Sequence, residues 1–150
     1  MYKTILVPLD GSELAEAILP HVEELARLGG GAIIFAQLIE IPHLVDQVKG
    51  DAFEALPHMT AADIDRQMQE ARHYLDTLID RERAKGIEAR GLVEYGPVVA
   101  TLLRLARQES AALIAMASHG RGGLADVYYG SVAAGILQRI DRPLLIVRAQ

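Results

Sequence analysis

Five short stretches of the chain are rich in apolar residues, and four of them are apolar almost without interruption. Runs of this length are typical of strands that are buried on both faces of a parallel sheet. The stretch at residues 87–94 carries more polar residues, which predicts a shorter strand near an edge of the sheet. The predicted strands cover residues 3–9, 32–39, 87–94, 111–117 and 143–147.

Segments with helical periodicity separate these strands. After the first strand, apolar residues recur at helical spacing over residues 14–28, and Ser12 is placed to cap this helix. Pro20 falls inside the pattern and predicts a kink, and the glycines at residues 29–31 end the helix. Further helices are expected over residues 61–85, after Gly96 and Pro97, and over residues 131–140.

The alternation of strands and helices predicts an α/β fold. Right-handed helical crossovers between buried strands give a single-domain, doubly wound, five-stranded parallel sheet with helices on both faces, here over residues 1–150. Such sheets bind ligands at the carboxyl ends of their strands. Residues 40–60 interrupt the alternation without a clear period, and they are either an irregular excursion or a lid or partner-binding segment.

Composition narrows the class of protein. Hydrophobic residues make up 51% of the 150 residues, yet no apolar run approaches the ~20 residues of a membrane span, and the N-terminus lacks a signal-peptide pattern. There is no cysteine, which excludes disulfides and thiolate zinc sites, and the five histidines are scattered without metal-ligand spacing. These features predict a cytoplasmic protein with no membrane association and no resident metal site.

The charge distribution argues against nucleic acid as a partner. The net charge is −5, whereas nucleic-acid binding needs a concentrated basic stripe. The densest basic stretch, residues 81–85, contains Glu82 and is predicted to be the solvated face of a helix. We therefore expect no nucleic-acid partner.

The glycine-rich loop between the fourth strand and the last helix suggests an anion site. Glycine allows the backbone to approach a ligand closely, and amide groups at a helix N-terminus bind phosphate. The helix expected at Ser131 has no acid in its first turn, whereas the one near Ser12 has Glu13 and Glu16. Phosphate is therefore expected at Ser131. Asp10, after the first strand, is either an acceptor for ribose hydroxyls or a simple turn aspartate.

The chain resembles the universal stress protein family along nearly its whole length. The resemblance lies in the opening ILVPLDGSELAEAIL, the strand AIIFAQLIE, the turn at residues 95–97, and ASHGRGGLADVYYGSVAAGIL followed by RPLLIV. The nucleotide-binding branch is marked by glycine, two residues, glycine, nine residues, glycine, then serine or threonine. Gly120, Gly130 and Ser131 match this pattern, and Ala117 stands where the first glycine is expected.

The resemblance implies a fold, a ligand and an assembly. It implies a sheet order of 3-2-1-4-5 and a homodimer that pairs through the strand from Pro143 to Val147, although that edge could instead be covered within the monomer. It implies ATP with Mg²⁺ as the ligand, bound somewhat more weakly because of the Ala117 methyl group. His119 is expected to hold the loop through a side-chain hydrogen bond. The triphosphate is assigned to Gly120, Gly130, Ser131 and the Val132 amide, with Arg121 nearby or simply solvated, and the adenosine to Pro8, Leu9, Asp10 and the backbone of Leu38.

No group of residues supports a particular catalytic reaction. The Walker pattern, the HExxH motif and the GxSxG elbow are all absent. The expected function is that of an ATP-binding stress-response protein, a nucleotide-dependent regulatory module with an unknown protein partner. The alternatives are a weak ATP hydrolase or nucleotidyl-transfer enzyme on the same scaffold, or a dimeric stress protein that has lost nucleotide binding.

Overall fold

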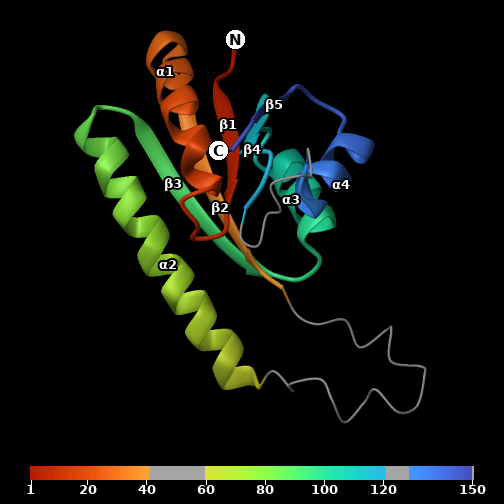
Figure 1. The fold of residues 1–150 in the computed structure, drawn as a ribbon. Helices are drawn as coiled ribbons and strands as arrows, with labels where there is room; N and C mark the ends of the chain where they lie inside the picture. The colour runs from red at the N-terminus through yellow and green to blue at the C-terminus, as the bar shows by residue number, and fades with distance from the viewer. Residues whose placement is uncertain (41–59, 121–128, 150) are drawn as a thin grey trace.

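The computed structural model describes residues 1–40, 60–120 and 129–149, and these residues form a parallel sheet with the strand order β3-β2-β1-β4-β5 (Figure 1). This order and the five strands confirm the predicted topology. The strand at the β3 edge is eight residues long, as long as β2, so the prediction of a shorter edge strand was wrong. The strands are β1 (Thr4–Leu9), β2 (Ala32–Ile39), β3 (Glu88–Tyr95), β4 (Leu113–Ala117) and β5 (Leu144–Val147).

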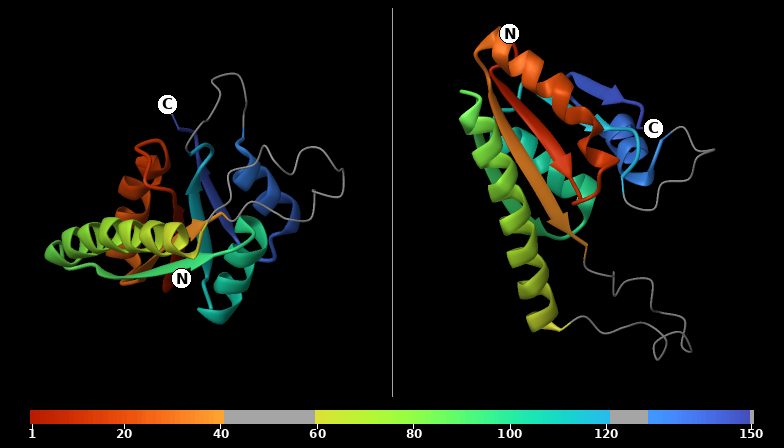
Figure 2. Two further views of the ribbon diagram at one scale, coloured as in Figure 1. Left: turned by 90° about the horizontal axis from the view of Figure 1, so that it is seen from below. Right: turned by 60° about the vertical axis from the view of Figure 1, so that its left-hand side comes forward.

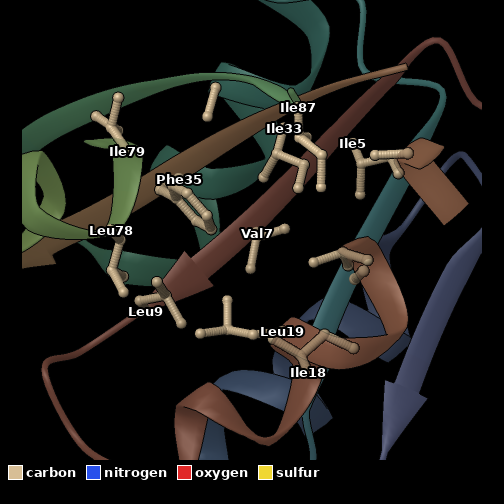
Figure 3. Close-up of a cluster of buried hydrophobic side chains, with 14 of the residues drawn as sticks. Ile5, Val7, Leu9, Ile18, Leu19, Ile33, Phe35, Leu78, Ile79 and Ile87 are labelled. Atoms are coloured by element: carbon tan, nitrogen blue, oxygen red, sulfur yellow. The ribbon is translucent and has the colours of Figure 1, made fainter. Parts of the chain in front are cut away.

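Helices cover both faces of the sheet, as predicted (Figure 2). On one face, Ile5 and Phe35 pack with Leu75 from a helix, in the cluster drawn in Figure 3. On the other face, Ile34 packs in a cluster with Leu102. Successive strand residues point to opposite faces, which is why each strand contributes to both clusters. The helices are α1 (Leu19–Gly29) and α2 (Ala61–Ala84) on the first face, and α3 (Val98–Gln108) and α4 (Ser131–Arg139) on the second.

The first helical segment differs from the predicted single kinked helix. A short 3-10 helix, η1 (Ala15–Ile18), precedes α1, and Pro20 lies in the first turn of α1. Proline is tolerated there because the amide groups of a first turn have no partner within the helix. The predicted kink inside the helix was therefore wrong. Ser12 acts as predicted, because its Oγ accepts a hydrogen bond from the Ala15 N–H at 3.2 Å.

The long helix α2 begins with a capping box and carries a buried charge. The side chains of Thr60 and Asp63 each accept a hydrogen bond from the other residue's backbone N–H. Farther along, Leu75, Leu78 and Glu82 lie on the buried side of the helix. The prediction that residues 81–85 form a solvated face was wrong at Glu82, whose side chain is fully buried. The buried, mostly apolar side of α2 therefore includes one carboxyl group, that of Glu82.

Glu82 is buried beside other charges from α1 and α2. Neither of its carboxyl oxygens has a hydrogen-bond partner in the described part of the chain. Lys85 Nζ lies 3.5 Å from Glu82 Oε1 and 2.9 Å from Glu23 Oε1 on α1. Burial, and then the neighbouring carboxylate of Glu23, raise the pKa of Glu82 above the usual value of 4.5.

Candidate functional site

A cleft of about 1140 Å³ opens at the carboxyl ends of the strands, where β1 lies between β2 and β4. From β1 the chain continues to β2, which lies on one side of β1, and it later returns to β4 on the other side. The strand order therefore reverses at β1. In doubly wound folds this is where ligands bind. The cleft brings together the predicted residues Pro8, Leu9, Asp10, Leu38, Ala117, Gly120, Gly130, Ser131 and Val132. The remaining predicted residue, Arg121, lies outside the described residues.

The N-terminus of α4 forms one wall of this cleft. Gly130 is the N-cap, and the first turn that follows contains no acidic residue, as predicted. The Gly130 N–H donates to the Ser118 carbonyl at 2.7 Å, which holds the start of the helix against the end of β4. The amide groups of the first turn have no partner within the helix and carry the positive end of its dipole. This wall therefore has the chemistry that binds an anion.

Asp10 and Gly120 meet at the floor of the cleft. Asp10 Oδ1 accepts hydrogen bonds from the Ser12 N–H at 2.9 Å and the Ser12 hydroxyl at 2.5 Å. A Cβ built on Gly120 would overlap the other carboxyl oxygen, Oδ2, of Asp10. Asp10 thus forms the simple turn considered in the sequence analysis and also lines the cleft. Gly120 is needed to make room for Asp10, a reason that the sequence pattern alone did not suggest.

The backbone of Leu38 lies at the end of β2. The Ala32 N–H donates to the carbonyl of Lys3, the residue before β1, and the Gly96 N–H donates to the Ile39 carbonyl from the opposite side. Because backbone groups alternate in direction along a strand, those of Leu38 face the side of β1. Pairing between β1 and β2 ends at Leu9 and Gln37, so the Leu38 carbonyl extends beyond the last pair. It is placed to accept a hydrogen bond from a ligand in the cleft.

Ser118, which the sequence analysis did not single out, organises the base of the glycine loop. Its side chain is buried, and its Oγ accepts a hydrogen bond from the Ala149 N–H at 3.1 Å. The same oxygen lies 2.9 Å from His119 Nδ1, which is the side-chain hydrogen bond expected of His119. The Ser118 N–H also binds the Val147 carbonyl at 2.8 Å. This serine therefore ties the loop to β5.

Three polar residues of α2 also line the cleft and were missed. Arg66, Glu70 and Tyr74 are spaced by four residues and so share one face of the helix. The Tyr74 hydroxyl donates to Glu16 Oε2 at 2.9 Å. Burial and this hydrogen bond raise the pKa of Tyr74 above its usual value. The four-residue spacing of these three side chains is visible in the sequence, but helical periodicity predicted only the apolar side of this helix.

Gly135, which the sequence pattern also did not single out, positions α4. A Cβ built on Gly135 would lie 2.7 Å from Val99 Cγ2 on α3. No carbon atoms approach so closely without a shift, so the absent side chain allows α3 and α4 to pack at this distance. Gly135 thereby helps to set where the N-terminus of α4 opens into the cleft.

The described residues show neither a membrane-spanning helix nor a cluster of metal ligands. No described helix has both the length and the apolar composition needed to cross a membrane. Within the same residues, histidine, aspartate and glutamate side chains form no cluster of three or more that could hold a metal ion.

The sheet order and the cleft define a doubly wound α/β protein with a candidate ligand site at the point where strand order reverses. Residues 1–148 match the model of the universal stress protein family. The chain belongs to this family.

Individual relatives agree with this assignment. Universal stress protein MJ0577 from Methanocaldococcus jannaschii is 26% identical over 160 residues, covering 99% of this chain and 96% of the relative. The solved structure of MJ0577 has a TM-score of 0.81 and 25% identity, covering 100% of this chain and 98% of that one. A universal stress protein solved with cAMP has a TM-score of 0.63 and 23% identity, covering 99% and 98%. One from Archaeoglobus fulgidus solved with dAMP has a TM-score of 0.64 and 20% identity, covering 97% of each chain.

Proposed function

We propose that this chain is an ATP-binding stress-response protein in which the nucleotide acts as a regulatory ligand. The observation that carries the proposal is that an acid-free helix N-terminus opens into the same cleft as the Leu38 carbonyl and Asp10. The two ends of the cleft thus differ in chemistry. One end suits phosphates, and the other suits a nucleoside.

Each predicted residue then has a role that follows from its position. Gly130, Ser131 and the Val132 amide hold the phosphates at the start of α4, with Gly120 beside them. Asp10 accepts a hydrogen bond from the ribose, and the Leu38 carbonyl accepts one from the base. Pro8, Leu9 and Ala117 form the apolar surface between these groups.

The ligand class has support from family members of the same fold. One universal stress protein was solved with cAMP and another with dAMP, both adenine nucleotides. The spacing of Gly120, Gly130 and Ser131 in this chain agrees with the nucleotide-binding branch of the family. Mg²⁺ would arrive with the triphosphate, because phosphate oxygens are its preferred ligands and the described residues offer no metal cluster of their own.

The test is a calorimetric titration of nucleotide-stripped protein with Mg-ATP. We expect saturable binding of about one ATP per chain, accompanied by a higher unfolding temperature. Steady multiple turnover of ATP in the same sample would favour the hydrolase alternative. The absence of both heat and thermal stabilisation at millimolar ATP would contradict the proposal and favour a stress protein that has lost nucleotide binding.

The methyl group of Ala117 gives a direct prediction for affinity. Ala117 is 5% exposed and lines the cleft where the family pattern has glycine. Replacing Ala117 by Gly should tighten Mg-ATP binding by about two- to tenfold, because the ribose and phosphates can then approach the backbone. The same change should lower the free energy of unfolding by about 0.5–1 kcal/mol, the usual effect of glycine within a strand. Unchanged or weaker affinity would mean that the methyl group does not limit binding.

We also infer that the protein forms a homodimer through β5. This strand lies at one edge of the sheet, and its four residues, Leu144–Val147, are all only partly buried. An apolar edge strand that remains unpaired promotes aggregation, and pairing with a second copy removes the edge. Sedimentation analysis should therefore give twice the 16.3 kDa mass of the chain. A monomer at micromolar concentration would contradict this inference.

A further inference from the structure

Two residues that line the cleft, Gln37 and His119, each have a buried side-chain atom without a hydrogen-bond partner in the described part of the chain, and in Gln37 the described hydrogen bonds include none from the side chain. Gln37 lies near the end of β2, paired in register with Leu9 on β1 and Val93 on β3. By the alternation of the strand, its side chain is on the same face as Phe35 and Ile33. Its Oε1 atom is buried without a hydrogen-bond partner among the residues that the structure describes. The residue nevertheless lines the cleft.

This arrangement is unfavourable for the protein alone. A buried polar atom without a hydrogen bond destabilises the folded state, because it has lost its hydrogen bonds to water and gained none in return. Buried polar atoms are nearly always paired, so an exception calls for a reason. The neighbouring β2 residues on the same face, Phe35 and Ile39, are apolar and buried, so a leucine at position 37 would suit the strand better than an amide.

We propose that the Gln37 carboxamide is the specificity-determining group that recognises the 6-amino edge of adenine. This inference rests on the proposed function and names the group that selects the base. A carboxamide presents an acceptor beside a donor, and adenine presents an amino donor beside a ring-nitrogen acceptor. Gln37 Oε1 accepts one hydrogen of the amino group, and the amide nitrogen donates to the ring.

The adjacent backbone removes the ambiguity that a glutamine alone would leave. A carboxamide can turn over and present its two groups in either order, so by itself it also pairs with guanine. The Leu38 carbonyl is a fixed acceptor at the end of the same strand. Guanine has a carbonyl oxygen where adenine has its amino group, and two acceptors facing each other repel. Gln37 and Leu38 together therefore favour adenine.

The experiment compares two ligands on two proteins. Two ligands are titrated into the wild-type protein and into Gln37→Leu. One is Mg-ATP, and the other is the purine ribonucleoside triphosphate that lacks the 6-amino group. We expect Gln37→Leu to weaken ATP binding by about 5- to 150-fold, the range that corresponds to a lost base contact of about 1–3 kcal/mol. Binding of the purine analogue should weaken clearly less than ATP binding, because the analogue lacks the amino donor and keeps only the ring nitrogen as a partner for Gln37. Gln69→Leu is the matched control, because Gln69 is an exposed residue of α2. This substitution should leave both affinities unchanged.

Stability of the nucleotide-free protein gives an independent readout. Gln37→Leu should unfold at the same temperature as the wild type or at a higher one, since it removes an unpaired buried acceptor. A lower unfolding temperature would show that Gln37 has a structural partner and would overturn the proposal. An equal loss of affinity for both ligands, or no loss of affinity for ATP, would also overturn this inference. Either result would leave the proposed function, ATP binding by the wild-type protein, standing. Failure of the wild type to bind ATP would overturn the proposed function and this inference with it.

Discussion

Gly130→Val is expected to weaken Mg-ATP binding by at least about 100-fold while the protein remains folded, a change of about 2.7 kcal/mol in binding free energy. The backbone of Gly130 has φ −68° and ψ 170°, which valine can adopt. A Cβ at this position would lie 3.3 Å from the Ser118 carbonyl oxygen, which is a tight contact. We expect the branched methyl groups to compete with phosphate for the space at the start of α4. Titration with Mg-ATP measures the effect.

The control for this prediction is a valine at a glycine remote from the cleft. Gly29 is the last residue of α1, and a Cβ there would have no atom within 4 Å. Gly29→Val should therefore bind Mg-ATP as the wild type does. The loss of a good N-cap in Gly130→Val should lower the free energy of unfolding by only about 1 kcal/mol, which circular dichroism can follow. A folded Gly130→Val protein with unchanged ATP affinity would refute the assignment of the phosphate site.

The free energy of unfolding is expected to fall as the pH rises above about 4.5, because of Glu82. Its pKa is raised in the folded state, so the folded protein binds the proton more tightly than the unfolded chain does. The resulting stabilisation is fully present below the unfolded pKa, and it is lost as the pH rises through the raised value. Above that value the ionised carboxylate lies buried beside Glu23, compensated only in part by Lys85.

Glu82→Gln removes this titration and should flatten the dependence of stability on pH. At pH 8 the variant should be more stable than the wild type by about 1 kcal/mol, because a neutral amide is buried at a lower cost than an ionised carboxylate. Glu24→Gln is the matched control, because Glu24 is exposed on α1 and pairs only with Arg27 in the described residues. Urea unfolding between pH 4 and pH 8 measures both variants. Parallel curves for Glu82→Gln and the wild type would show that Glu82 does not titrate in this range.

Several features of the cleft followed from local patterns in the sequence. Apolar periodicity identified the strands and helices, and the spacing of Gly120, Gly130 and Ser131 located the start of α4 correctly. These predictions succeeded because strand burial, helix periodicity and capping depend on residues close together in the chain. The sheet order was predicted through the family resemblance and was confirmed.

Other features depended on contacts between distant segments. Gly120 makes room for Asp10, and Gly135 allows close packing against Val99, so each glycine has a reason that lies on another element. The sequence showed that Glu82 lies among basic residues, but its burial results from the way α2 packs. Likewise, Pro20 begins α1 instead of kinking it because η1 ends just before it.

The periodicity of the chain was thus enough to identify most of the elements and the fold class, because short-range physics dictates both. The unpaired acceptor of Gln37 could not be recognised in this way. A glutamine in a strand is ordinary until the surroundings of its amide are known, and those surroundings come from other strands and helices. Whether a polar group is satisfied depends on every segment that packs around it, and that is settled only in the folded molecule.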